Sequence, residues 1–319
     1  MNPIKTVFII SFSLLAASLW ARPAHETSLT VYGLKGPSGV GMIRMFENPP
    51  VIPGFEVKME ALAQADLMAA RFISQDAKVG ILPANIAAKI AASGRNIRIA
   101  AVTGTGMLSL LTSDPQVGRI EDLRGKTVEV AGQGATPDYV FRRLLKVRGI
   151  DPEKDLTLSY SLAYPEIAQS LIAGRVSVAL LPEPFSTMAL SGNPGLRRAG
   201  DIQEEWSKAG GQGNYPMTAL VLDGDFAAYN PGAVKIILEN LKDSIEWTAA
   251  NPAAAGALVE KHDFGLKASV AAAAIPRSNY VFIPAAEARP SIEALFRVFL
   301  EFSPDSIGGA MPGDHFYYP

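Results

Sequence analysis

Two glycine-rich loops are the stretches of this sequence best suited to contact a small ligand. They read Gly36-Pro37-Ser38-Gly39 and Gly132-Gln133-Gly134-Ala135-Thr136-Pro137, and each stands between an apolar run and a helical pattern. Glycine lets the backbone approach a ligand closely, and the free amides at a helix start favour electron-rich groups. We expect Ser38 and Thr136 to cap the helices that follow, with Pro137 in the first turn. Because such loops precede helices in any α/β protein, a purely structural role stays open.

Residues at the ends of other apolar runs are further candidates for the same site. Glu183 stands between two prolines after a buried strand, where its carboxylate can accept hydrogen bonds from a ligand. The remaining candidates are Pro83, Asn85, Gly104, Thr105, Tyr164, Asn214 and Tyr215. Each also has an ordinary structural reading, as a helix cap, a core or rim aromatic, or a turn residue. Glu183 is equally compatible with a solvated loop charge.

Residues for catalysis or metal binding are scarce in this chain. The sequence has no cysteine, and its histidines are His25, His262 and His315, far apart in sequence. A thiolate metal site and a cysteine nucleophile are therefore excluded, and a multi-histidine zinc site is not indicated. No nucleophile elbow, zinc-protease motif, phosphate-binding P-loop or dinucleotide fingerprint occurs. We expect neither a cofactor nor a metal.

The elements that must position the loops follow an α/β pattern. Short β-branched runs alternate with longer helical stretches, which predicts parallel sheets flanked by helices. Strands are expected over 29–34, 56–61, 78–82, 97–102, 107–112, 127–130, 156–161, 176–181 and 217–222. Helices are expected over 40–47, 65–74, 84–92, 137–148, 166–173, 233–249, 253–262, 268–274 and 291–301.

These elements divide into two lobes joined by a two-segment hinge. We assign residues 25–112 and 218–319 to lobe I and residues 113–217 to lobe II, so that the chain crosses near Thr112 and near Asn214. Ligands of open α/β sheets bind beyond the carboxyl ends of the strands. The glycine-rich loops of the two lobes should therefore face a shared cleft.

Composition and the N-terminal residues indicate an exported protein. The chain has 319 residues, 48% hydrophobic and 19% charged, and a formal net charge of -2 without a basic patch for nucleic acid or anionic membranes. Lys5, an apolar run over 7–19 and small residues at Ala21 and Ala24 predict a signal peptide over 1–24, cleaved near Ala21 or Ala24. The run is shorter than the roughly 20 residues of a membrane-spanning helix. We expect a soluble periplasmic monomer.

Seven stretches, in order along nearly the whole mature chain, resemble the solute-binding proteins of the nitrate, sulfonate and thiamine-precursor import group. They are Leu34 to Met42, Leu82 to Ala87, Asp122 to Thr127, Gly132 to Tyr139, Leu181 to Phe185, Glu205-Trp206, and Ile307-Gly308-Gly309 with Phe316-Tyr317-Tyr318. The resemblance implies a type II periplasmic binding fold with a small organic anion or heteroaromatic solute between the lobes. It also implies contacts from Ser38, Asn85, Thr136 and Glu183, and an ABC permease and ATPase as partners.

A periplasmic enzyme and a sensory domain are the alternatives to a receptor. A periplasmic enzyme of the same fold, a lyase or deaminase acting on a small cyclic metabolite, stays possible because substrate loops alone do not distinguish binding from turnover. The synthase branch of the resembled family depends on a cysteine-rich motif and an active-site histidine, and the lack of cysteine here disfavours it. A sensory domain is disfavoured because no second apolar run has the length of an anchor.

Overall fold

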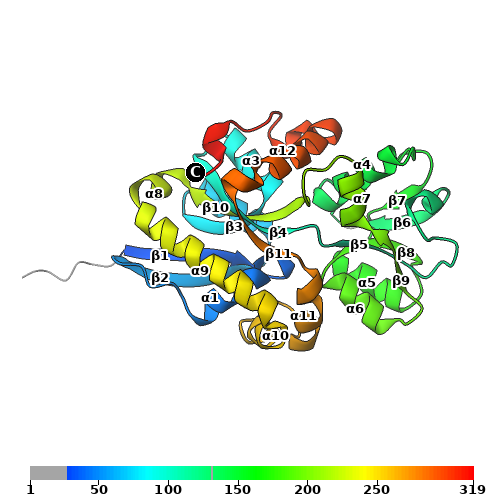
Figure 1. Cartoon of the computed structure of the whole chain (residues 1–319), viewed down its shortest axis with the longest axis horizontal. Helices are drawn as coiled ribbons and strands as arrows, with labels where there is room; N and C mark the ends of the chain where they lie inside the picture. The colour runs from blue at the N-terminus through cyan, green and yellow to red at the C-terminus, as the bar shows by residue number, and fades with distance from the viewer. Residues whose placement is uncertain (1–26, 131) are drawn as a thin grey trace, which may run out of the picture.

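The structure of the protein is a computed structural model that describes residues 27–130 and 132–319. The predicted signal peptide over residues 1–24 lies outside the described residues. Within them the chain forms two α/β lobes, each built on its own sheet (Figure 1). Among the described helices, none combines the length and the apolar character needed to cross a membrane.

The sheet of lobe I has six strands in the order β11-β4-β10-β3-β1-β2. They are β1 (Thr27–Leu34), β2 (Phe55–Leu62), β3 (Val79–Pro83), β4 (Ile97–Thr105), β10 (Pro216–Asp223) and β11 (Tyr280–Pro284). β1 pairs in parallel with β2 and β3, whereas β10 runs antiparallel to β3 and β4. Helices cover both faces of this sheet, so the central strands β3, β4 and β10 are buried along nearly their whole length.

The helices of lobe I come from both ends of the chain. They are α1 (Ile43–Glu47), α2 (Ala65–Ile73), α3 (Ala84–Ala92), α8 (Gly224–Tyr229), α9 (Pro231–Ala250), α10 (Pro252–Lys261), α11 (Ala268–Ala274) and α12 (Ala285–Phe302). The helix predicted over 291–301 begins at Ala285 and passes through Pro290. Pro290 removes one backbone hydrogen bond, and the buried face of α12, including Ile292, Leu295 and Phe299, outweighs that loss.

The sheet of lobe II has five strands in the order β7-β6-β8-β5-β9. They are β5 (Leu108–Thr112), β6 (Thr127–Val130), β7 (Thr157–Ser159), β8 (Val178–Pro182) and β9 (Arg197–Asp201). The helices are α4 (Thr136–Val147), α5 (Tyr164–Ile172), α6 (Phe185–Gly192) and α7 (Ile202–Lys208). The strand β9 and the helices α6 and α7 were not predicted from the sequence.

The first crossing between the lobes lies near Gly106, and the crossing predicted near Thr112 is wrong. β4 ends at Thr105 in the sheet of lobe I, and β5 begins at Leu108 between β8 and β9 of lobe II. Every residue of β5 is buried, which is expected of a strand with neighbours on both sides. Residues 108–112 therefore belong to lobe II. The return crossing runs from the end of α7 to the start of β10 at Pro216.

The two crossings are tied to each other by hydrogen bonds. The Gly106 N–H donates to the carbonyl of Tyr215 at 2.9 Å, and the Asn214 amide donates to the Thr105 hydroxyl at 3.3 Å. The Asn279 amide, just before β11, donates to the Gly106 carbonyl. A Cβ on Gly106 would stand 2.2 Å from the Asn214 Oδ1. Glycine is needed at this position because the two connections approach so closely.

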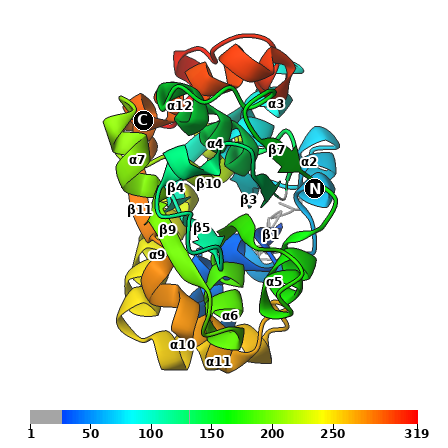
Figure 2. The same cartoon turned by 90° about the vertical axis from the view of Figure 1, so that its right-hand side faces the viewer.

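The lobes also touch on two sides of the crossings (Figure 2). Tyr139 of α4 packs against Phe299 and Phe302 of α12, with ring centroids 5.1 and 5.9 Å apart. Glu301 of α12 pairs with Arg143 at 3.4 Å and with Lys146 at 3.1 Å. On the opposite side α6 packs against α11. These contacts surround the space between the lobes.

Candidate functional site

A cavity of about 220 Å³ lies between the lobes, and we call it the front cleft. Lobe I contributes residues that follow β1 and β3, and lobe II contributes residues around the start of α4 and α5 and the end of β8. Its lining is Pro37, Ser38, Pro83, Asn85, Ile86, Met107, Ala135, Thr136, Pro137, Tyr164, Pro182, Met217 and Thr218. The structure thus brings together seven of the candidates taken from the sequence: Pro37, Ser38, Pro83, Asn85, Ala135, Thr136 and Tyr164.

The two predicted helix caps are wrong, and the error affects the chemistry of the front cleft. Gly36, with a φ of 77°, is the N-cap of the 3-10 helix Pro37–Met42, so Ser38 lies inside that helix. Ala135 is the N-cap of α4, which makes Thr136 its first residue. Neither helix start has a side-chain cap hydrogen bond. Both hydroxyl groups therefore remain available to a ligand.

Three polar side chains in the front cleft lack a hydrogen-bond partner among the described residues. Asn85 is 8% exposed and Thr136 is 5% exposed. Tyr164 is also largely enclosed, and burial raises the pKa of its hydroxyl to about 12, so that it stays a neutral donor. A buried polar group without a partner costs about 1–3 kcal/mol. Such groups are found where a ligand completes the hydrogen bonding.

The rest of the front cleft supplies apolar contact area. Tyr164 stacks on Phe185 with ring centroids 5.7 Å apart and an interplanar angle of 24°, which fixes the orientation of its ring. Ile86, Met107 and Met217 add aliphatic and thioether surface. Apolar walls with a few fixed polar groups are typical of small-molecule sites. No charged side chain among the described residues lines this cavity.

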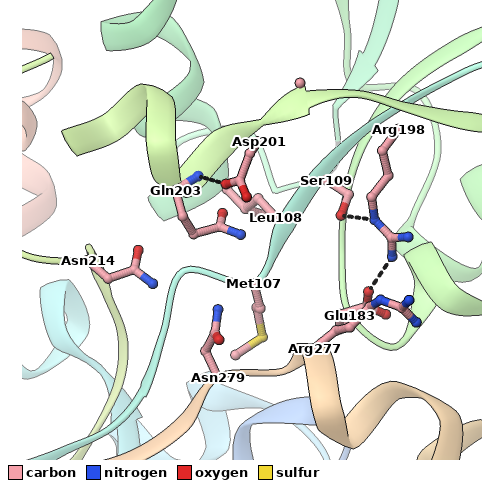
Figure 3. Close-up of a pocket in the computed structure, with 11 residues that line it drawn as sticks. Met107, Leu108, Ser109, Glu183, Arg198, Asp201, Gln203, Asn214, Arg277 and Asn279 are labelled. Carbon is pink, nitrogen blue, oxygen red and sulfur yellow. Dashed lines mark hydrogen bonds and ion pairs between the residues drawn. The ribbon is translucent and has the colours of Figure 1, made fainter. Parts of the chain in front are cut away.

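A larger cavity of about 660 Å³ lies beside the crossings, and we call it the rear cavity (Figure 3). Its lining is Met107, Leu108, Ser109, Glu183, Arg198, Gly200, Asp201, Gln203, Asn214, Arg277 and Asn279. Glu183 and Asn214, both predicted as ligand contacts, face this cavity and not the one that Ser38 and Thr136 line. Sequence reasoning missed Arg198 and Arg277, because neither follows a predicted strand.

The carboxylate of Glu183 already has protein partners. Its side chain is 2% exposed, and its Oε1 accepts from the Arg198 guanidinium at 3.0 Å. Its Oε2 accepts from the Thr187 N–H at 3.0 Å. The Arg198 Nε donates in addition to the Ser109 hydroxyl at 3.2 Å. Glu183 is therefore a buried, paired carboxylate, and its first role here is to hold Arg198.

The remaining sequence candidates shape the backbone or belong to the core. Gly132 and Gly134 have φ values of 77° and 76°, which favour glycine, and Gln133 and Gly134 line a separate hollow between lobe II and Phe302 of α12. Tyr215 is fully buried and donates to Gln203 at 2.9 Å, and burial raises the pKa of its hydroxyl. Of the others, Gly36 caps the 3-10 helix Pro37–Met42, Gly39 lies inside that helix, and Gly104 and Thr105 end β4. None of these four lines either cavity.

A metal site is not formed by the part of the chain that the structure describes. Within residues 27–130 and 132–319, no three histidine, aspartate or glutamate side chains come together in a way that could hold an ion. His262 instead makes a 2.8 Å contact with Glu47 on the surface of lobe I.

Known proteins that resemble this chain share its two-lobed architecture. An ABC transporter structure from Parabacteroides distasonis is 26% identical with a TM-score of 0.78, and the match covers 92% of this chain and 99% of that one. The aliphatic sulphonate binding protein SsuA from Escherichia coli is 16% identical with a TM-score of 0.72, covering 92% of each chain. The nitrate-binding protein NrtA from Synechocystis is 12% identical with a TM-score of 0.63, covering 88% of this chain and 84% of that one.

At the level of sequence, no protein with a curated description is significantly similar. The profile of the NMT1-like family matches residues 58–261, which is more than half of the chain and spans most of both sheets. The match includes β3 and α4, whose ends line the front cleft. The chain therefore belongs to the NMT1-like family and has the fold of the periplasmic binding proteins.

Proposed function

We propose that this protein is the extracytoplasmic solute-binding receptor of an ABC import system. It binds a small organic anion or heteroaromatic solute in the front cleft and delivers it to a membrane permease. The solved structures that share its fold include binding proteins of this kind, which supports the role. It is exported with a signal peptide over residues 1–24, cleaved near Ala21 or Ala24, and acts as a monomer without chemical turnover.

One observation carries this proposal: unpartnered polar side chains from both lobes converge on the front cleft. Ser38 and Asn85 come from lobe I, and Thr136 and Tyr164 from lobe II. A solute that bonds to both sets is held more tightly when the lobes approach, so binding shifts the population toward the closed form. Closure then changes the surface that the permease recognises.

The lining of the front cleft also bears on the class of solute. Hydroxyl and amide donors together with the amides at the start of α4 favour an electron-rich group such as a sulfonate, nitrate or ring nitrogen. The stacked pair Tyr164 and Phe185 offers a flat aromatic wall. Because charged side chains are lacking among the described lining residues, backbone and neutral donors do the binding.

Native mass spectrometry of protein purified without denaturation, followed by a thermal-shift screen, identifies the solute. The screen contains sulfonates, nitrate, pyrimidines and small organic acids. Ligand at about 100 times its Kd stabilises the fold by about 2.7 kcal/mol. Recovery of the unchanged compound after incubation supports a receptor, and its conversion to a product contradicts the proposal.

Variants of Ser38 and Thr136 test whether the solute occupies the front cleft. Ser38→Trp and Thr136→Arg fill the cavity from opposite lobes and abolish the stabilisation by the solute. Ser28→Trp and Thr127→Arg are matched controls, because they place the same side chains at exposed sites near the starts of β1 and β6. The controls keep the stabilisation. If both cleft variants also keep it, the front cleft is not the binding site.

A further inference from the structure

We propose that the rear cavity is a second solute site, which binds a small carboxylate carrying a hydroxyl group. It is separate from the front cleft, and it does not depend on the receptor role proposed above. Its volume of about 660 Å³ lies within the 300–1,000 Å³ that is roughly typical of small-molecule sites. Its position, its two arginines and its free amide groups support this assignment.

The rear cavity lies on the other flank of the crossings from the front cleft. The crossing strands β4 and β10 stand side by side in the sheet of lobe I, with β3 and β1 on one flank and β11 on the other. Residues that follow β1 and β3 line the front cleft, whereas Arg277 and Asn279 before β11 line the rear cavity. In lobe II the rear cavity likewise takes its wall from the edge strand β9. Met107 separates the two spaces and lines both.

Two guanidinium groups face the rear cavity from opposite lobes, and one of them is left without a counter-charge. Arg198 of β9 is fixed by Glu183 and Ser109, which together use its Nε and one terminal nitrogen. Arg277 lies at an exposed position before β11, and among the described residues it has neither an ion pair nor a side-chain hydrogen bond. Figure 3 shows its side chain beside the Glu183–Arg198 pair. Of the two carboxylates in the lining, Glu183 binds Arg198 and Asp201 caps α7, so Arg277 is the guanidinium left to bind an anion. Guanidinium binds carboxylates in a bidentate manner.

The other end of the rear cavity suits a hydroxyl group. The Gln203 carbonyl accepts from Tyr215, which leaves its amide N–H groups free to donate. The Asn279 amide nitrogen donates to Gly106, which leaves its carbonyl free to accept. Asp201 caps α7 with one oxygen, its Oδ1, and the second oxygen has no partner among the described residues. A hydroxyl group both donates and accepts, so it satisfies this mixed set better than an apolar group does.

Isothermal titration of the mature chain with two matched pairs of acids tests the proposal. The pairs are L-malate with succinate and L-lactate with propionate, which differ in each case by one hydroxyl group. At least one hydroxy acid binds at millimolar concentration or below, and more tightly than its partner. If neither hydroxy acid binds, or if the hydroxyl makes no difference in either pair, the proposal is wrong.

Variants then locate the bound acid. Arg277→Ala weakens its binding by about tenfold or more, which corresponds to 1.4 kcal/mol, while Arg277→Lys keeps part of the affinity. Arg175→Ala is the matched control, because Arg175 is an exposed arginine outside both cavities. Ser38→Trp leaves the binding unchanged, since it fills only the front cleft. An unchanged Kd in Arg277→Ala, or loss of binding in Ser38→Trp, overturns the assignment to the rear cavity.

Discussion

Replacing Arg198 by methionine isolates the buried carboxylate of Glu183, and we expect the free energy of unfolding to fall by about 3 kcal/mol. The Glu183 side chain is 2% exposed, whereas that of Arg198 is 34% exposed. Methionine keeps the packing of the side-chain stem but removes the charged donor at 3.0 Å. Only the Thr187 N–H then bonds to the carboxylate. Because water reaches Arg198, the expected loss is at the low end for a broken buried pair.

A double-mutant cycle separates the pair from the cost of each change. Glu183→Gln keeps the shape of the side chain and removes its charge, and we expect it to cost about 1–2 kcal/mol. The double variant Glu183→Gln with Arg198→Met leaves no unpaired buried charge. It should therefore be more stable than the sum of the single losses predicts, by about 1–2 kcal/mol.

Urea unfolding followed by far-ultraviolet circular dichroism measures these differences, with the slope m checked to be unchanged. If Arg198→Met costs less than about 1 kcal/mol, the pair behaves as a surface salt bridge and Glu183 is not isolated by burial. If the losses of the two single variants simply add, the two groups do not interact, and Glu183 does not hold Arg198 in place at the rear cavity.

Three further changes test the packing between the lobes, the packing at the crossing and an ion pair of lobe I, all by the same unfolding measurement. Tyr139→Ala removes a ring packed on two phenylalanines of α12 and costs about 3 kcal/mol, whereas Tyr139→Phe costs little. Gly106→Ala costs about 1–3 kcal/mol because its Cβ meets Asn214, whereas Gly232→Ala has open space and costs nothing. Glu47→Gln lowers the stability of the fold at neutral pH. Hydrogen bonds from Lys261 and His262 hold the pKa of Glu47 below its ordinary 4.5, and glutamine has no charge for them to stabilise. The stability that the ionised Glu47 carboxylate contributes is present above its ordinary pKa and is lost as the pH falls through its lowered pKa in the folded protein. The stabilities of the variant and the wild type therefore converge in acid.

The sequence predicts the inner strands and most helices of this fold well, because each carries a clear pattern. Apolar runs mark β3, β8 and β10, and helical periodicity marks α4 and α9 within a few residues of their observed ends. The start of α12 was misplaced because Pro290 ordinarily ends or begins a helix, whereas here the packing of the helix overrides the local preference. The resemblance to the import-group binding proteins is confirmed by the family match and the shared fold.

The lobe boundary shows a second limit of sequence reasoning. The run from Ile97 to Thr112 contains two strands separated by Gly106 and Met107, and nothing in the residue types says that they belong to different sheets. The polar stretch after Thr112 predicts a crossing at that point. Which sheet a strand joins depends on its distant partners, and here β8 and β9 take up β5. Such long-range pairing is not encoded in a local pattern.

The sequence predicts the front cleft but not the rear cavity, because the two cavities take their lining from different kinds of strand. The front cleft lies at the carboxyl ends of parallel strands, where a general rule places ligands, and its glycine loops are visible in the sequence. The rear cavity takes its two arginines from β9 and from the segment before β11. Both β9 and β11 are edge strands with irregular antiparallel pairing. β9 reads Arg-Arg-Ala-Gly-Asp, which has neither β-branched residues nor alternation. Charged residues on an edge strand normally prevent that strand from pairing with another chain. Arg198 and Arg277 come together only because the two lobes face each other across the rear cavity. The charged lining of this cavity therefore depends on the whole fold and is not visible in any single segment of the sequence.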